Sequence, residues 1–205
     1  MVTRPRSDDV LYRPPDDPVL VEVPGFDFAM VDGSGDPNTS PDYQQALAAL
    51  YSFSYPVAIT LKRAGRVGLK VGTLEGLWWA DDMAAFDTVG DRTAWRWTMM
   101  IRQPDDIPAE VVAAARARVV AKVGATAGQS LRLERFEEGR CAQVMHHGPY
   151  ADERPTIERL HAFVADQGLR LRGRHHEIYL SDPRRTVPAA MRTILRQPVG
   201  PAGTD

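Results

Sequence analysis

Two stretches of this chain repeat one pattern, and this internal repeat limits the possible folds more than any other feature. Residues 26–53 and residues 139–166 each begin with a short apolar strand, pass through a Gly/Pro turn and enter an amphipathic helix. In both helices the apolar residues recur at spacings of three and four, which indicates one buried side. These residues are Tyr43, Ala46, Leu47, Leu50 and Tyr51 in the first helix, and Ile157, Leu160, His161 and Val164 in the second. We expect Asp152 to be the N-cap of the second helix, with Pro155 in its first turn.

A second pair of segments extends the repeat. Residues 95–120 and residues 175–199 each indicate a strand, a loop that contains proline, and a helix opened by Pro108 or Pro188. Proline suits the first helical position because an N–H there would have no partner within the helix. The helix after Pro108 is expected over residues 109–123.

Further strands are expected between these segments. One lies within residues 67–80, and residues 131–147 are typical of a hairpin with Glu138 and Gly139 at its turn. Each half then has the order strand, helix, strands, helix.

This order predicts an α+β fold in which antiparallel strands carry helices on one face. Two related halves commonly join their sheets about a pseudo-two-fold axis, and the uncovered face would then form a groove for a ligand. We place the two modules at about residues 19–124 and 125–199, within one domain that spans residues 19–199. Residues 1–18, with several prolines and mixed charges, are expected to be a flexible arm, and residues 200–205 a tail.

Composition narrows the class of partner. The net charge is −2, so no basic excess indicates a nucleic-acid surface. No stretch approaches the roughly 20 apolar residues that a membrane span needs, and the N-terminus has no apolar run. The single cysteine, Cys141, is expected to be a small buried residue in a reducing compartment. We therefore expect a cytoplasmic protein whose partner is a small molecule, with the oligomeric state left open.

The histidine pairs do not predict a metal site. In His146-His147 and His175-His176 the two neighbours point to opposite faces of a strand, so each pair offers one ligand to a given site. The glycines of residues 32–37 lack the lysine of a phosphate loop. We expect no metal and no cofactor.

Glu177 is a carboxylate on a strand with apolar neighbours. Alternation sends Glu177 and Tyr179 to one face, and His176, Ile178 and Leu180 to the other. If Ile178 and Leu180 pack under the helices, Glu177 points to the uncovered face. Desolvation in an aromatic groove would raise the pKa of this carboxyl group and make it a usable base near neutral pH. The alternative is a surface glutamate paired with an arginine.

The aromatic residues of the first half have the same two possible roles. Alternation places Thr98 and Met100 on the uncovered face, and Trp97 with its neighbours toward the helices. Trp78 and Trp79 are adjacent, so they cannot both enter one core. Most such aromatics are core residues, but an aromatic groove with a few polar groups is the usual form of a small-molecule site.

Four motifs together resemble the GyrI-like small-molecule-binding proteins. They are TLEGLWW (73–79), WRWTMMIRQPD (95–105), HHGPYADERPTI (146–157) and HHEIYLSDPRR (175–185), continued by TILRQPV up to residue 199. The chain is most similar to the stand-alone bacterial branch of that family, over residues 19–199. The resemblance implies duplicated strand–helix–strand–strand modules that form one antiparallel sheet, with helices on one face and a ligand groove on the other.

The resemblance also implies a ligand class. The same domain is the drug-sensing half of multidrug-responsive transcription regulators, where a central glutamate meets cationic, aromatic ligands. Glu177 matches that glutamate. A protein of this kind would bind bulky, flat aromatic or cationic molecules for detoxification or sequestration, without binding DNA, because no helix-turn-helix precedes the domain. The expected ligand-binding residues are Glu177, Trp79, Trp97, Tyr55, Met100, Tyr150 and Tyr179.

Two other functions follow from the same resemblance. Some stand-alone relatives hydrolyse the cyclopropane of cyclopropanoid cyclohexadienone toxins. In that reaction Glu177 would take a proton from water, and Tyr150 or Tyr179 would hydrogen-bond the carbonyl group. Strand alternation favours Tyr179, the GPY turn favours Tyr150, and Trp79 and Trp97 would stack on the flat substrate. A protein inhibitor of a gyrase-like enzyme is the second alternative.

Overall fold

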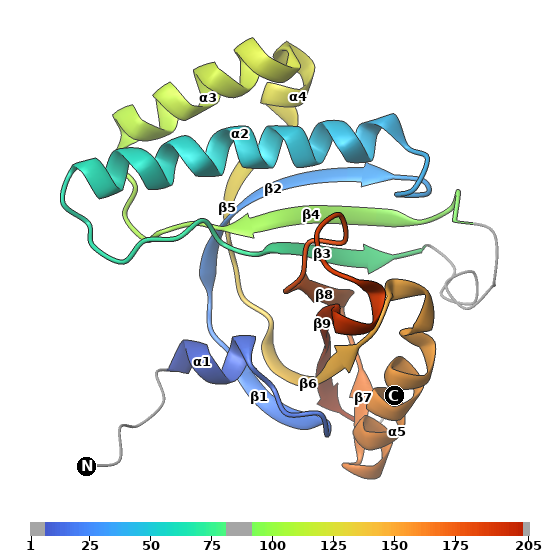
Figure 1. The fold of residues 1–205 in the computed structure, drawn as a ribbon. Helices are drawn as coiled ribbons and strands as arrows, with labels where there is room; N and C mark the ends of the chain where they lie inside the picture. The colour runs from blue at the N-terminus through green and yellow to red at the C-terminus, as the bar shows by residue number, and fades with distance from the viewer. Residues whose placement is uncertain (1–6, 81–91, 203–205) are drawn as a thin grey trace, which may run out of the picture. The chain divides into compact units, whose positions relative to one another are not determined.

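The computed structural model describes residues 7–80 and 92–202. The chain divides into two compact units: unit 1 holds residues 1–25 and 137–205, and unit 2 holds residues 26–136 (Figure 1). The boundary predicted near residue 124 falls inside unit 2, because residues 132–136, which follow it, pair with residues 26–30 of that unit.

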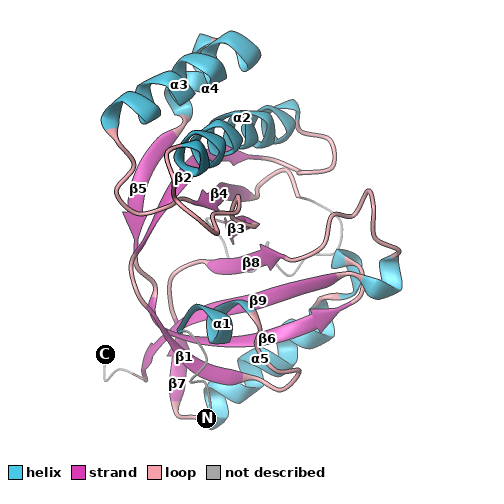
Figure 2. Ribbon diagram, turned by 60° about the vertical axis from the view of Figure 1, so that its left-hand side comes forward, coloured by secondary structure: helices cyan, strands magenta, loops and turns pink. Residues whose placement is uncertain are grey.

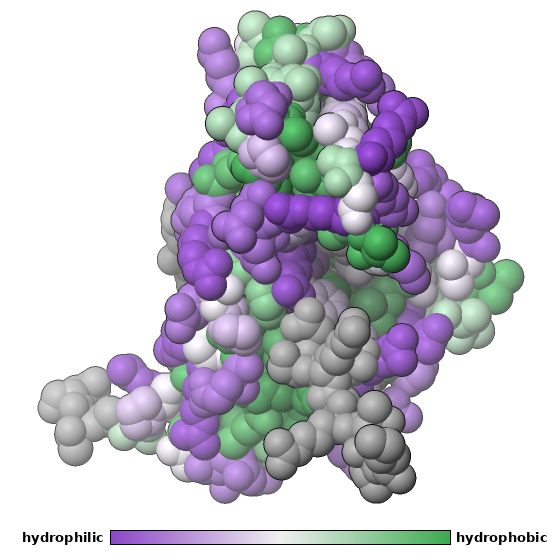
Figure 3. Space-filling view, turned by 90° about the vertical axis from the view of Figure 1, so that its left-hand side faces the viewer, coloured by the Kyte–Doolittle hydropathy of each residue, from purple (hydrophilic) through white to green (hydrophobic). Residues whose placement is uncertain are grey.

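Unit 2 is an antiparallel sheet with the strand order β3-β4-β2-β5 and helices on one face. Helix α2 lies along the sheet, and α3 packs on the outer side of α2 (Figure 1). Hydrophobic and hydrophilic residues mix at the top of Figure 3, where α3 and α4 lie. The elements are β2 (Phe26–Ser34), α2 (Pro41–Arg63), β3 (Leu74–Trp79), β4 (Arg96–Arg102), α3 (Ala109–Val123), α4 (Ala125–Ser130) and β5 (Arg132–Phe136).

Helix α2 is longer than predicted. The Ser40 side chain caps it by accepting a hydrogen bond from the Tyr43 N–H at 3.4 Å, and Pro41 occupies its first turn. The helix continues beyond residue 53 and through Pro56, because the buried spacing of three and four residues does not stop there. Its buried side chains include Ala46, Leu50, Phe53, Val57 and Leu61.

Strand β4 has the alternation that the sequence predicts. The Trp97 ring lies 5.3 Å from the ring of Tyr43 on α2, in an edge-to-face arrangement. Gln103, just after the strand, donates a hydrogen bond from Nε2 to the Ser54 hydroxyl of α2 at 2.8 Å. Met100 has the opposite parity and lies on the sheet face away from α2.

Within unit 1 the strands pair antiparallel in the order β1-β6-β9-β8, and β7 also pairs with β9 (Figure 2). Helix α5 covers one face, where Leu160 and Val164 pack on Val144 of β6 and Leu195 of β9. The elements are α1 (Ser7–Tyr12), β1 (Val19–Val23), β6 (Gly139–His147), α5 (Arg154–Asp166), β7 (Leu169–Leu171), β8 (His175–Tyr179) and β9 (Arg192–Pro201).

The two units repeat one topology, as predicted, but the segments correspond differently. Both contain strand, helix, strand, strand: β2–α2–β3–β4 in unit 2 and β6–α5–β8–β9 in unit 1, with matching strand orders. The α+β class of antiparallel strands with helices packed on one side is confirmed. In this repeat β4 matches β9 and β3 matches β8, so the predicted match of residues 95–102 with the HHEIY strand is wrong.

The helix expected after Pro188 is also wrong. Only a 3-10 turn, Pro188–Ala190, forms there, and β9 follows at once. β9 pairs with β6 on one side and with β8 on the other, and a strand with two partners satisfies its backbone groups fully. Tertiary pairing therefore outweighs the helical signal of proline followed by two alanines.

Two predicted turns differ in the structure. Strands β5 and β6 do not form a hairpin, because β5 pairs with β2 and β6 pairs with β1 and β9. Asp152 is not the N-cap of α5, because Tyr150–Asp152 form a 3-10 turn and the cap is Glu153. Pro155 does lie in the first turn of α5.

The described part of the N-terminal arm is held in place, against expectation. Residues 7–12 form α1, and buried Leu11 accepts a hydrogen bond at its carbonyl from Arg196 at 2.8 Å. Gln143 donates from Nε2 to the Val10 carbonyl at 3.0 Å. Residues 1–6 of the predicted arm and 203–205 of the predicted tail lie outside the described residues.

Within residues 7–80 and 92–202, none of the helices combines the length and the apolar character that crossing a bilayer requires.

Candidate functional site

Glu177 lies on the side of the unit 1 sheet that carries α5, which corrects the prediction of a helix-free face. Register pairs Glu177 with Leu195, and Leu195 belongs to the core that packs against α5. Ile178 lies on the opposite face, where it packs with Met145, Ile194 and Tyr12 of α1. The alternation along β8 was predicted correctly, but the apolar residue that it buries is covered by the N-terminal segment.

The three predicted catalytic residues come together at this point. The Tyr179 hydroxyl donates a hydrogen bond to Glu177 Oε2 at 2.7 Å. The ring of Tyr150, from the turn before α5, lies 5.4 Å from the Tyr179 ring in an edge-to-face arrangement. The Glu177 side chain is 15% exposed, so the carboxylate is largely desolvated and still reachable. This arrangement suits proton transfer, because the Glu177 carboxylate is hydrogen-bonded to the Tyr179 hydroxyl and a second phenol, Tyr150, lies beside Tyr179.

His175 is a neighbour that the sequence reading did not select. Its Nε2 lies 3.6 Å from Glu177 Oε1. Burial lowers the pKa of His175 to about 3, and nearby His161 of α5 lowers it further. The ring beside Glu177 is therefore neutral at physiological pH. The sequence did indicate this position, because residues 175 and 177 are two apart on one strand and their side chains therefore point to the same face.

The turn that carries Tyr150 is fixed by His146. The ring bonds Thr156 through Nδ1 at 3.0 Å and the Pro149 carbonyl through Nε2 at 3.3 Å. Since a carbonyl only accepts, Nε2 carries the proton and Nδ1 accepts from the threonine hydroxyl. Burial lowers the pKa of His146, which favours this neutral form. Gly148 completes the turn with a φ of 125°, which favours glycine.

The ligand-binding residues predicted in unit 2 do not gather on one surface of that unit. Trp97 is fully buried against α2, whereas Tyr55 is 53% exposed on α2 and lies beside Tyr51. Met100 is fully buried, and it shares the face opposite α2 with half-buried Trp79. Roles for these four residues in binding, and the ligand groove itself, stay predictions.

A buried ionic cluster occupies the other face of unit 1. Glu138 Oε2 lies 3.0 Å from both His176 Nδ1 and Arg196 Nη1. Burial by itself would raise the pKa of Glu138, but His176 and Arg196 outweigh burial and lower the pKa to about 2. Arg196 also donates from Nε to Gln143 at 3.1 Å, and from Nη2 to α1. This cluster holds strands and helix α1 together on the face away from Glu177.

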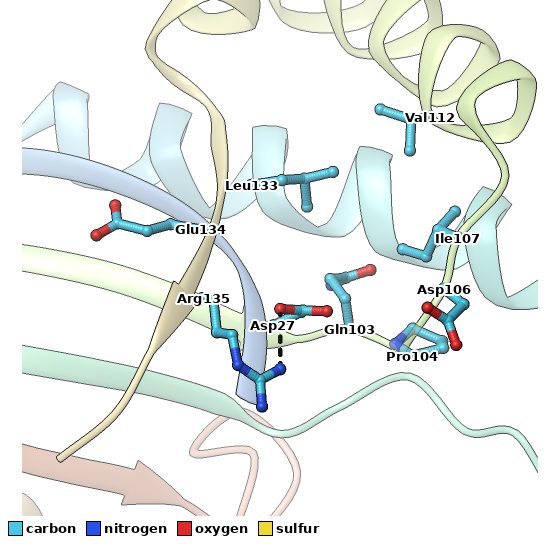
Figure 4. Close-up of a pocket in the computed structure, with 9 residues that line it drawn as sticks. All are labelled: Asp27, Gln103, Pro104, Asp106, Ile107, Val112, Leu133, Glu134 and Arg135. Carbon is cyan, nitrogen blue, oxygen red and sulfur yellow. Dashed lines mark ion pairs between the residues drawn. The ribbon is translucent and has the colours of Figure 1, made fainter. Parts of the chain in front are cut away.

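A separate cavity of about 280 Å³ lies within unit 2 (Figure 4). Two of its three carboxylates are paired: Asp27 lies 3.5 Å from Arg135, and Glu134 lies 2.7 Å from Arg132. No predicted site residue lines this cavity. Within the described ranges no group of three or more metal-ligating side chains occurs.

The comparisons with known proteins agree with this fold. A family model described as GyrI-like small molecule binding domain matches residues 16–198. The search of curated proteins gave no match.

Solved structures from Listeria innocua are similar over nearly their whole length. One, of an uncharacterized conserved protein, is 38% identical, with a TM-score of 0.85, and the match covers 94% of this chain and 97% of that one. Another, described as a hydrolase, is 37% identical with a TM-score of 0.82, covering 94% and 96%. The C-terminal domain of EcmrR, at 14% identity and a TM-score of 0.54, covering 91% and 98%, shares the fold alone.

Proposed function

Since this chain belongs to the GyrI-like small-molecule-binding family, we propose that it binds a bulky, flat small molecule beside Glu177 and hydrolyses it. The observation that carries the proposal is the 2.7 Å hydrogen bond from the Tyr179 hydroxyl to the Glu177 carboxylate, with Tyr150 packed against Tyr179. The description of a 37% identical structure as a hydrolase supports the same reaction class.

The proposed substrates are cyclopropanoid cyclohexadienones. Glu177 takes a proton from water, and the resulting hydroxide oxygen bonds to the cyclopropane carbon. The carbon–carbon bond of the ring breaks, and its electron pair moves through the dienone to the carbonyl oxygen, which becomes a phenolate and then gains a proton. The sum is the addition of one water molecule. A tyrosine hydroxyl that hydrogen-bonds the carbonyl oxygen stabilises the charge that develops there.

Tyr179 and Tyr150 have different places in this proposal. The Tyr179 proton is engaged by Glu177, so Tyr179 orients the base. Tyr150 is 37% exposed, so part of its side chain lies where a substrate can contact it. Tyr150 is therefore the better candidate for the hydrogen bond to the carbonyl group.

Incubation with a cyclopropanoid cyclohexadienone, followed by chromatography and mass spectrometry, tests the proposal. We expect a hydrated product, and Glu177→Gln should slow its formation by about 10²- to 10⁴-fold, as loss of a general base does. The control is Glu137→Gln, at an exposed residue outside the site. No turnover by the wild type, or equal turnover by both variants, would reject this proposal.

Binding without chemistry is the second candidate. A largely buried carboxylate between a phenol and an imidazole ring also suits a cationic aromatic ligand, since aromatic faces attract cations. Micromolar quenching of tryptophan fluorescence by a cationic dye, reduced in Glu177→Gln and accompanied by no turnover of the dienone, would favour this candidate.

A further inference from the structure

Thr193 of β9 lies in a row of side chains that crosses the site. Strand β9 lies between β6 and β8 (Figure 2), and the register places Thr193 opposite His146 of β6 and opposite Tyr179 of β8. All three side chains therefore share the face of the sheet that carries Glu177. Thr193 therefore lies between His146, which fixes the turn that carries Tyr150, and Tyr179, which donates a hydrogen bond to Glu177.

The Thr193 hydroxyl is a buried polar group without a partner in the described part of the chain. The side chain has no exposed surface, and Oγ1 has no hydrogen bond to any described residue. The neighbouring His146 ring uses both nitrogens, for Thr156 and for the Pro149 carbonyl. A buried hydroxyl is unfavourable unless it is hydrogen-bonded, so its partner should be a small polar group that enters the site.

We propose that Thr193 Oγ1 holds the water molecule that Glu177 activates, an inference that rests on the proposed function. Glu177 lies one side-chain position along β8 from Tyr179, so Thr193 and Glu177 are diagonal neighbours with Cβ atoms about 7 Å apart. A water that bridges two oxygen atoms joins points about 5.5 Å apart. The side-chain oxygens of both residues extend from these Cβ atoms, so an oxygen–oxygen span of about 5.5 Å is within reach of the pair.

In this arrangement the water has two fixed contacts. It accepts a hydrogen bond from the Thr193 hydroxyl and donates one O–H to Glu177. Its second lone pair points at the substrate carbon, so the proton goes to Glu177 while the oxygen forms the new carbon–oxygen bond. Thr193 gains and loses no proton, and acts by orienting the nucleophile.

Thr193→Val tests this role because valine keeps the shape and removes the hydroxyl. We expect kcat to fall about 5- to 10-fold, the effect of one hydrogen bond, with KM little changed, and Thr193→Ser to restore most of the rate. Thr60→Val, at an exposed position of α2, is the control for the same chemical change. Unchanged kinetics in Thr193→Val would overturn the inference.

High-resolution crystal structures without substrate give a readout that does not depend on catalysis. The wild type should hold an ordered water within hydrogen-bond distance of Thr193 Oγ1 and Glu177, and Thr193→Val should lose it. A wild type without that water would overturn the inference even if the enzyme is active. The water together with no turnover would reject hydrolysis and keep Thr193 as a hydration site.

Discussion

At the scale of single residues, the site depends on which way a few side chains of β8 point. Glu177, Tyr179 and His175 share one face, and burial keeps His175 neutral beside the carboxylate. Alternation was sufficient to predict that Glu177 and Tyr179 lie together. It could not show which face the helix covers, because Ile178 finds its apolar partners under α1 instead.

Tyr179→Phe should separate orientation of the base from aromatic packing. The ring and its contact with Tyr150 remain, but Glu177 loses the hydrogen bond of 2.7 Å. A charge-assisted hydrogen bond contributes about 1.5–3 kcal/mol, so we expect kcat/KM for the dienone to fall by about 10- to 100-fold. Steady-state kinetics measures this loss, with Tyr51→Phe on α2, which has no predicted role in binding, as the control. Equal rates in the two variants would contradict a role for the hydroxyl.

At the scale of elements, the repeat was the strongest signal in the sequence and also the source of the largest errors. It predicted the strand and the amphipathic helix that open each module, because amphipathic spacing is a local property of α2 and α5, whereas the strand–helix–strand–strand order was implied by the family resemblance. It failed where pairing decides the structure: β9 is a strand between two partners, although Pro188 and the alanines after it favour a helix. Which strand of one unit corresponds to which strand of the other follows from their places in the strand order of the sheet, and that order cannot be determined from the sequence.

The contact between β2 and β4 gives a prediction at this scale. A Cβ atom added at Gly33 would lie 2.1 Å from Cη2 of Trp97, so the indole ring depends on the absence of a side chain there. Gly33→Ala should lower the free energy of unfolding by about 1–3 kcal/mol, the cost of overpacking a core. Urea unfolding followed by tryptophan fluorescence measures the change.

Gly200→Ala in β9 is the matched control for that change. Its added Cβ would meet Arg172 Cδ at 3.6 Å, an ordinary contact. If Gly33→Ala and Gly200→Ala have the same stability, Trp97 does not depend on Gly33.

At the scale of the whole molecule, buried ionisable groups link folding to pH. The pKa of Glu138 is about 2, below its ordinary value of 4.5, and the pKa of His175 is about 3, below its ordinary 6.5. Both groups bind protons more readily in the unfolded chain, so acid favours unfolding. The sequence did not predict this, because Glu138 was assigned to a hairpin turn and its partners are distant along the chain.

We therefore expect the free energy of unfolding to fall with acidification below about pH 6.5. The contribution of His175 is lost as the pH drops from 6.5 toward 3, and that of Glu138, on the order of 3 kcal/mol, as it drops from 4.5 toward 2. Urea titrations at a series of pH values measure the decline. In His175→Gln the decline between pH 6.5 and 4.5 should be smaller, and an unchanged decline would contradict a buried neutral His175.

Unit 1 is made from both ends of the chain, with β1 before unit 2 and its partner β6 after it. During synthesis on the ribosome, β1 emerges early and waits for β6 until every residue of unit 2 has been added. The pairs β2–β4, β2–β5 and β3–β4 are complete once residue 136 has been added, so unit 2 is free to fold first. A stalled nascent chain that ends far enough beyond residue 136 for β5 to have left the ribosome should therefore resist protease digestion over unit 2, whereas the segment before β2 should still be cleaved.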